Sequence, residues 1–267
     1  MTALSVVVCV KPVPDPEHWE KITLDPVTKA LRREGIPSAI NPLDKHALEE
    51  ALRIKEKHGA NVTVVSMAPP TVMDNLREAI ALGADEAILL SDRSFAGADT
   101  LATSYVLAAG IRKLGKFDMV ICGNQSLDGS TGQVGPEVAE FLGVPHVTNV
   151  RKMDFIGRGL IRVESAIEHG YISMEVQIPA VLTVVREINT PRHIPLARIS
   201  EAMRREIKTW TMKDLDVDRK MVGLSGSPTQ VADIFMPETK RRGEILGGEP
   251  EIVVKLLVEK LRQLGVM

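Results

Sequence analysis

The first half of the chain alternates short apolar runs with longer amphipathic runs, which restricts the folds open to it. Leu4 to Val10 is apolar and β-branched, a pattern typical of a strand that is buried on both faces. Asn41 and Pro42 then begin a helical stripe that ends at Gly59, and the same strand–helix order continues as far as Leu142. Such alternation with short connections predicts an α/β fold, a parallel sheet covered by helices on both faces.

The later strands and helices of this half are marked by the same signals. Strand-like runs end at prolines, glycines or polar residues, and helical stripes end at glycine or basic residues. The expected strands are Val62 to Met67, Ala87 to Leu90 and Met119 to Cys122. Asp99 is the expected N-cap of the helix that runs to about Leu114, and Gln133 to Leu142 is expected to form the last helix of the repeat.

After about Val144 the pattern changes, because strand-like runs follow one another with turns and no helix between them. We expect these runs to form an antiparallel extension of the sheet. They are Val147 to Met153, Leu160 to Ile167, Tyr171 to Gln177 and Ala180 to Val185.

From Pro191 onward the sequence favours an arm rather than more of the sheet. A helix is expected from Leu196 to about Glu206, then a Gly/Pro/Ser-containing stretch through Pro250, then an amphipathic helix from Glu251 to Leu264. A long stretch with little core-forming pattern is unusual inside a compact monomer, so we interpret it as an arm that packs on another subunit. The expected domains are residues 1–190 and residues 191–267.

The segment Gly123 to Pro136, which reads GNQSLDGSTGQVGP, directly follows an apolar strand. A strand that runs into a glycine- and hydroxyl-rich loop and then a helix directs backbone N–H groups and a positive helix end at one place. An adenine nucleotide fits there. The segment contains neither G-x-G-x-x-G nor G-x-x-x-x-G-K-[ST], so neither the usual dinucleotide fold nor a P-loop kinase is indicated.

Composition excludes several other classes. The net charge is -2 with 25% charged residues, which predicts neither nucleic-acid binding nor an anionic membrane as partner. The first residues lack a signal peptide and no apolar run is long enough to span a membrane, so a cytoplasmic location is expected. Cys9 and Cys122 lie in apolar runs and are expected to be reduced core thiols. The six scattered histidines do not indicate a metal site.

Several motifs, in order along nearly the whole chain, closely resemble the β subunit of electron-transfer flavoproteins. They include VVVCVKPVPD, NPLDKHALEEALRIKEKHG, FDMVICGNQSLDGSTGQVGP and IPAVLTVVREINTPRHIP. The resemblance implies an adenine-nucleotide α-hydrolase-like domain with a nucleotide across the ends of the first, second and fourth strands. It also implies a heterodimer with an α subunit that holds a second, redox-active FAD and is embraced by the C-terminal arm. Three positions of the family signature differ, at Ser165, His169 and Ile172.

The resemblance also identifies candidate site residues, by position in this sequence. The expected cofactor-binding residues are Cys9, Lys11, Asn41, Asp44, Met67, Gly123, Ser126, Asp128, Gly129, Ser130, Thr131, Gly132, Gln133 and Val134. Ile188 is a separate candidate, argued from pattern: an apolar residue between polar neighbours in the segment Arg186 to Pro191 suits a small, transient interface, so it is the expected anchor for a partner dehydrogenase.

Several of these residues also have a purely structural interpretation. Lys11 suits a solvated strand end, and Asp128 suits a turn or a helix cap. Asn41 and Asp44 are explained by helix-start chemistry, and Met67 is a common core residue. Their roles as ligands therefore depend on the resemblance more than on spacing.

The loop LDGSTGQV looks like that of flavin-based electron-bifurcating members, in which the β subunit binds FAD. In the mechanism this implies, NADH reduces that FAD, one electron passes to ferredoxin or flavodoxin, and the other passes through the α-subunit flavin to an acyl-CoA or hydroxyacid dehydrogenase. Such an electron-transfer subunit of an oxidoreductase complex requires no catalytic side chain. The alternatives are a conventional electron carrier with structural AMP and a stand-alone nucleotide-binding signalling module.

Overall fold

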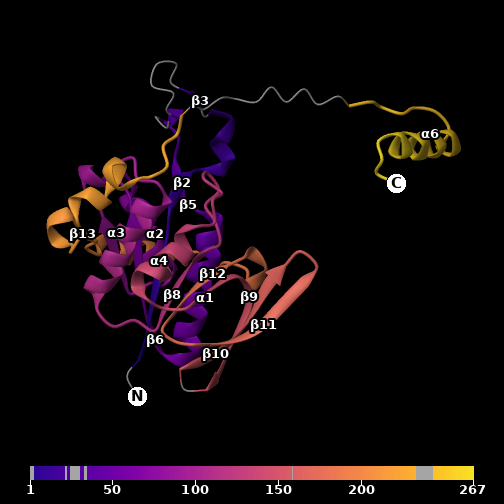
Figure 1. The fold of residues 1–267 in the computed structure, drawn as a ribbon. Helices are drawn as coiled ribbons and strands as arrows, with labels where there is room; N and C mark the ends of the chain where they lie inside the picture. Colours follow the sequence, from indigo (N-terminus) through magenta and orange to yellow (C-terminus); the bar gives the residue numbers. More distant parts are fainter. Residues whose placement is uncertain (1–2, 22, 25–30, 33–34, 158, 233–242) are drawn as a thin grey trace. The chain divides into compact units, whose positions relative to one another are not determined.

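The computed structural model describes residues 3–21, 23–24, 31–32, 35–157, 159–232 and 243–267 (Figure 1). The chain forms two compact units, Met1–Ala232 and Asp233–Met267. The expected boundary at residue 190 therefore falls inside the first unit. That unit contains the sheet and both of its helical layers.

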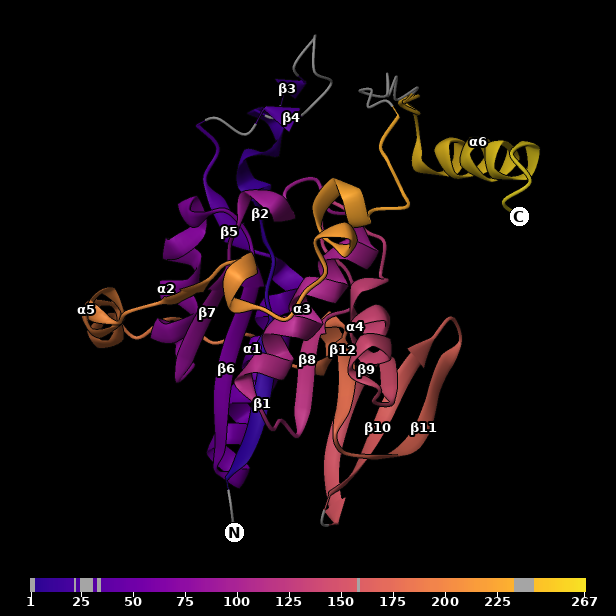
Figure 2. The same cartoon turned by 60° about the vertical axis from the view of Figure 1, so that its left-hand side comes forward.

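A nine-stranded sheet is the framework of the first unit (Figure 2). Its strands lie in the order β11-β10-β9-β12-β8-β1-β6-β7-β13. The chain therefore moves from β1 to β6 and β7 on one side, and then returns to β8 on the other side of β1. The strands are β1 (Leu4–Cys9), β6 (Ala60–Met67), β7 (Glu86–Leu90), β8 (Met119–Gly123), β9 (His146–Gly157), β10 (Leu160–Ile167), β11 (Gly170–Gln177), β12 (Ala180–Val184) and β13 (Lys208–Trp210).

The six strands from β12 to β13 are parallel, and only β10 and β11 form the antiparallel extension beyond β9. The sequence-based assignment of Ala180 to Val185 to the extension was wrong. β12 lies between β8 and β9, parallel to both, with all five of its residues buried. A run that is buried on both faces suits a central parallel strand, and the chain reaches this position by returning across β10 and β11.

Helices cover both faces of the sheet, as the alternation predicted. α1 and α2 pack on the face that carries Val6 and Val8, whereas α3 and α4 pack on the face that carries Val7 and Cys9. Alternate residues of β1 therefore enter two separate cores. The helices are α1 (Pro42–His58), α2 (Met73–Leu82), α3 (Thr100–Leu114) and α4 (Val134–Leu142).

Part of the stretch assigned to an arm belongs to the first unit. α5 (Leu196–Arg204) contacts α2, and β13 extends the sheet beside β7. Leu215 and Val222 are buried in the same core as α3, and the Ser227 hydroxyl accepts from the N–H of Asp99. These residues lie in short turns without a periodic pattern, so periodicity alone did not reveal that they pack here.

Two small sheets accompany the N-terminal strand. β2 (Pro12–Pro14) pairs with β5 (Ser38–Ile40), and β3 (Thr23–Leu24) pairs with β4 (Leu31–Arg32), both antiparallel. The first pair directly precedes α1 and so connects the end of β1 with the start of that helix.

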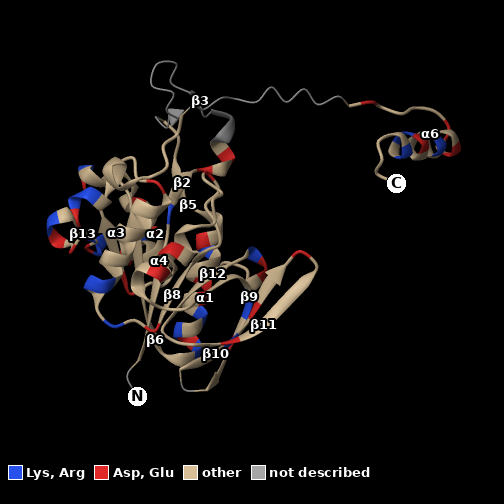
Figure 3. Ribbon diagram, viewed as in Figure 1, with Lys and Arg blue, Asp and Glu red and all other residues tan. Residues whose placement is uncertain are grey.

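The second unit contains α6 (Pro250–Gln263), close to the helix expected from Glu251 to Leu264. Its apolar side chains are exposed, including Ile252, Val254 and Leu257. Figure 3 shows basic and acidic residues interspersed along this helix. No helix in the described part of the chain is long and apolar enough to cross a membrane.

Candidate functional site

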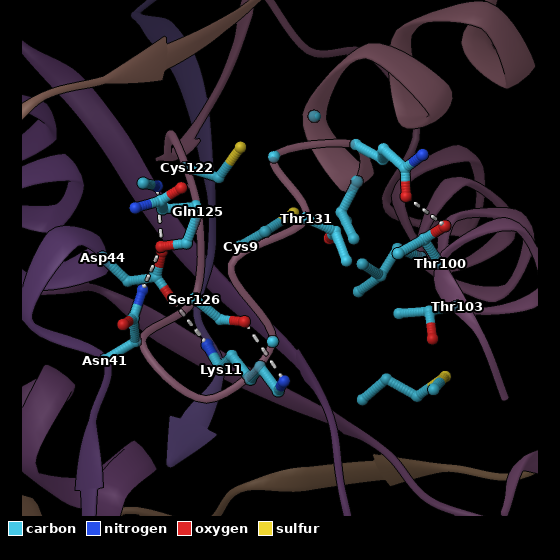
Figure 4. A pocket seen from close by; sticks show the side chains of 18 of the residues that line it. Cys9, Lys11, Asn41, Asp44, Thr100, Thr103, Cys122, Gln125, Ser126 and Thr131 are labelled. Carbon is cyan, nitrogen blue, oxygen red and sulfur yellow. Dashed lines mark hydrogen bonds between the residues drawn. The ribbon is translucent and has the colours of Figure 1, made fainter. Parts of the chain in front are cut away.

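A pocket of about 380 Å³ opens where β1, β6 and β8 end (Figure 4). Cys9 and Lys11 line it from the end of β1, Met67 from the end of β6, and Cys122 from β8. Because the chain crosses from one side of β1 to the other before it forms β8, the gap above β1 and β8 is a topological switch point. Open α/β sheets bind their ligands at this place.

The loop between β8 and α4 forms one wall of the pocket. Within the described residues, no protein group accepts from the backbone N–H of Gly129, Thr131 or Gly132. Gly132 has φ +65°, which is the left-handed region that favours glycine. The loop therefore presents free donors directly before a helix N-terminus, an arrangement suited to an anionic group.

Asn41 holds this loop from the start of α1. Its side-chain amide donates to the carbonyl of Gln125 at 2.9 Å, and its side-chain oxygen accepts from the N–H of Leu127 at 3.1 Å. It precedes α1 as predicted, but its side chain does not cap the helix. The loop takes up one N–H and the oxygen of this amide, and the amide also bonds to Asp44, so the side chain serves tertiary structure.

Asp44, one turn into α1, joins the ends of the two central strands. One carboxylate oxygen accepts from the N–H of Lys11 at 2.8 Å, and the other accepts from the N–H of Gly123 at 2.9 Å. Burial raises the pKa of Asp44 to about 6, although these two hydrogen bonds and the charge of Lys11 act against the rise. The carboxyl therefore lies in a dry environment at the base of the pocket.

Lys11 reaches across the pocket to the loop. Its ammonium group donates to Asp128 at 2.6 Å and to the hydroxyl of Ser126 at 3.3 Å. The Lys11 side chain is half-exposed, whereas that of Asp128 is largely buried. This contact explains Asp128, which the sequence placed among ribose or turn residues, and it puts a cation beside the free N–H groups of the loop.

Two thiols form the floor. Cys9 and Cys122 are free, as predicted, and both are buried. Burial, with a contribution from nearby Asp44, raises the pKa of Cys9 to about 12, and burial also raises the pKa of Cys122. Both thiols therefore stay protonated at neutral pH and give the pocket an uncharged floor.

The structure brings most of the predicted residues to one pocket. Asp128 and Ser130 are outside its lining, although Asp128 contacts it through Lys11. The predicted residues that line it are Cys9, Lys11, Asn41, Asp44, Met67, Gly123, Ser126, Gly129, Thr131, Gly132, Gln133 and Val134.

The opposite wall was missed by sequence reasoning. It consists of the turn after β7 and the first turns of α3, with Phe95, Thr100, Thr103 and Leu107 facing the pocket. The Thr100 hydroxyl bonds to the side chain of Gln133 at 3.2 Å, which connects the two walls. A usable signal existed, because β7 is parallel to β6 and the carboxyl ends of parallel strands meet at one edge.

Comparison with known proteins agrees with this geometry. Residues 28–215 match the electron transfer flavoprotein domain. The chain is 48% identical, over 97% of its length, to the electron transfer flavoprotein subunit beta of Clostridium acetobutylicum, of which 98% is covered. The chain belongs to the electron transfer flavoprotein family, among its β subunits. It is also 50% identical to the subunit beta of Thermoanaerobacterium thermosaccharolyticum, over 97% of this chain and 98% of the relative.

A third relative of this β subunit carries a more specific name. The chain is 44% identical to the caffeyl-CoA reductase-Etf complex subunit CarD of Acetobacterium woodii, again over 97% of this chain and 98% of the relative. Members of the family bind flavin or AMP, and the β subunits pair with α subunits.

The segment that contains Ile188 lies apart from the pocket lining, on the side of α1. Ile188 is half-buried and packs against the main core. Asn189 donates to the carbonyl of His46 at 2.9 Å and to Glu50 at 3.1 Å. Arg192 donates to Glu49 at 2.8 Å and 3.2 Å from two guanidinium nitrogens, and its backbone N–H donates to the same carboxylate. The segment is therefore held firmly on α1.

Proposed function

We propose that this β subunit binds FAD in the pocket above β1 and β8 and works in flavin-based electron bifurcation. In this proposal the complex takes electrons from NADH and delivers them to ferredoxin or flavodoxin and, through an FAD in the α subunit, to an acyl-CoA or hydroxyacid dehydrogenase. The observation that carries it is the 44% identity to CarD, a subunit of a reductase–Etf complex, along almost the whole chain.

The pocket fits an adenine nucleotide with a diphosphate. Free N–H groups at Gly129, Thr131 and Gly132 offer donors to phosphate oxygens, and the half-exposed ammonium group of Lys11, paired with Asp128, lies beside them.

The protein's own groups bind and shield rather than react. FAD, when bound, supplies the electron-accepting and electron-donating chemistry. Lys11 and the loop would orient the diphosphate, while the protonated thiols of Cys9 and Cys122 exclude water without adding charge. Thr103, on the opposite wall, offers a hydroxyl group to the ligand. The Thr100 hydroxyl instead bonds to Gln133 and Glu137 and holds the two walls together.

The opposite wall favours FAD over AMP. A nucleoside monophosphate is small enough to use the loop wall and the strand ends alone. Across the pocket from the loop, Phe95 and Leu107 add apolar surface and the threonines add polar groups. A larger aromatic cofactor would use both walls.

The cofactor content of the purified heterodimer tests this proposal. After reconstitution with excess FAD, we expect two FAD per heterodimer and no AMP, measured by extraction and chromatography. One FAD and one AMP per heterodimer would instead identify a conventional electron carrier. If the chain instead purified without an α subunit and still bound a nucleotide, the signalling-module alternative would be favoured.

We further propose that Ile188 contacts the partner dehydrogenase, as its place between polar neighbours suggested. Ile188→Ala is expected to raise the partner concentration needed for half-maximal electron transfer by about tenfold, because buried apolar anchors dominate small interfaces. Glu187→Gln, at the exposed neighbouring position, is the control and should change it little. Flavin content should stay the same in both variants. Unchanged transfer by Ile188→Ala at limiting partner would contradict the proposal.

The described part of the C-terminal unit is proposed to bind the α subunit. α6 exposes several apolar side chains along its length, among them Ile252, Val254 and Leu257. Exposed apolar surface of this kind marks protein contacts. Residues 233–242, which belong to the expected arm, lie outside the described residues.

A further inference from the structure

In the part of the chain that the structure describes, Asp44 is the single side chain that bonds to the backbone at the ends of both β1 and β8. It accepts from the N–H of Lys11, after β1, and from the N–H of Gly123, at the end of β8. A β-carbon at residue 123 would lie 2.6 Å from the Asp44 carboxylate and 2.7 Å from Leu43. Glycine at this position is therefore what lets the first turn of α1 approach β8 closely enough for this contact.

We propose that Asp44 is a positioning residue of the nucleotide site: it joins the chain where it leaves β1 to the end of β8, beyond their last paired residues, and so holds the loop after β8 in its binding geometry. Both of its oxygens already accept hydrogen bonds from the protein, so it acts through the backbone rather than as a direct ligand. This inference rests on the proposed function, because it concerns the same pocket.

The contact depends on the charge of Asp44. A carboxylate accepts strongly with both oxygens, whereas a protonated carboxyl keeps one good acceptor and places a hydrogen on the other oxygen. The titratable groups around it are Cys9 and Cys122, which stay protonated, and Lys11, whose ammonium group is turned to Asp128. None of these three groups gains a proton in place of Asp44 as the pH falls. The pKa of Asp44, near 6, therefore places the loss of its negative charge within an accessible pH range.

Asp44→Asn imitates the protonated form. Its amide oxygen can accept from only one side, and its NH₂ group would face one of the two backbone N–H groups, of Lys11 or Gly123, that the carboxylate accepts from. The control is Glu50→Gln, which neutralises another buried acid of α1 whose side chain bonds to Asn189, away from the pocket. The probe is ADP-ribose, since both phosphates of its diphosphate are esterified and it lacks the secondary phosphate ionisation that occurs near pH 6. It is titrated into the heterodimer after the exchangeable nucleotide has been removed.

We expect wild-type affinity to fall about tenfold between pH 7.5 and pH 5, as Asp44 gains its proton. Asp44→Asn should bind at pH 7.5 as weakly as the wild type at pH 5, and its affinity should hardly change between these pH values. Glu50→Gln should follow the wild-type profile.

Two results overturn the inference alone. One is wild-type affinity that stays constant or rises as the pH falls, and the other is an Asp44→Asn variant that keeps the wild-type affinity at pH 7.5. The pH dependence of ADP-ribose affinity in the wild type tests the inference even if the Asp44→Asn variant does not fold. Absence of ADP-ribose binding by the wild type at every pH would overturn the proposed function instead, and this inference with it.

Discussion

Replacing Gly123 with alanine is expected to abolish nucleotide binding and to lower the free energy of unfolding by about 3 kcal/mol. The added methyl group would lie 2.6 Å from the Asp44 carboxylate and 2.7 Å from the backbone carbonyl carbon of Leu43. Backbone cannot move away as a flexible side chain can, so α1 must shift from β8. Urea unfolding of the heterodimer and its extracted nucleotide content measure both effects.

Gly129→Ala is the matched control, in the same loop and with the same added atom. Its methyl group would meet the Ser126 hydroxyl at 3.2 Å and the Lys11 ammonium group at 3.9 Å, both of which are ends of flexible side chains. We expect a change in unfolding free energy below about 1 kcal/mol. Equal effects of the two substitutions would show that close approach of α1 to β8 is not what Gly123 provides.

Removing Arg192 is expected to produce the second large effect, a loss of about 2 to 3 kcal/mol of stability in Arg192→Ala. Its partner Glu49 has a side chain that is only 6% exposed. Burial alone would raise the pKa of Glu49, but hydrogen bonds from Arg192 and the arginine charge outweigh burial and lower it. Without the Arg192 guanidinium group the buried carboxylate keeps only Arg53 as an ion-pair partner among the described residues, at 3.2 Å. Within the same residues, the segment around Ile188 is then hydrogen-bonded to α1 only through Asn189.

The pH dependence of this loss gives a further check. Because pairing lowers the pKa of Glu49 below its ordinary value of 4.5, the pair contributes stability above that pH, and the contribution disappears as the pH falls through the lowered pKa. The difference between Arg192→Ala and wild type should therefore shrink in acid. Glu56→Gln is the control, since the Glu56 side chain is 60% exposed and its ion pair with Arg192 should contribute less than about 1 kcal/mol. A loss in Glu56→Gln as large as in Arg192→Ala would contradict the role of the buried pair.

Local pattern was a good guide wherever one run of residues determined one element. The run from Leu4 gave a buried strand, and Asp99 caps α3 as expected, with its carboxylate accepting from the N–H of Ala102 at 3.0 Å. The same approach failed at β12, since five buried residues identify a strand but not its neighbours. Strand order depends on the path of the whole chain, and the return across β10 and β11 leaves no mark in the five residues themselves.

The site was predicted in the same uneven way. The loop after β8 was identified because its glycines and hydroxyl groups are consecutive in the sequence. The wall formed by Phe95 and Thr100 was missed, because it joins the pocket only through the parallel pairing of β7 with β6. Family resemblance placed Asn41 and Asp44 at the site, but their actual contacts, to the backbone of the loop and of two strands, come from the fold.

The sequence by itself determined the α/β class, the family and the segment that forms the loop wall of the pocket, since each depends on residues that are close together in the chain or on motifs in a known order. Tertiary structure alone decided the place of β12, the second wall and the partners of Asp44 and Arg192. Lys11 and Gly123, which Asp44 connects, are more than a hundred residues apart in the chain. Their proximity results from packing α1 against two neighbouring strands, and that packing reflects the burial of the whole core rather than any local preference.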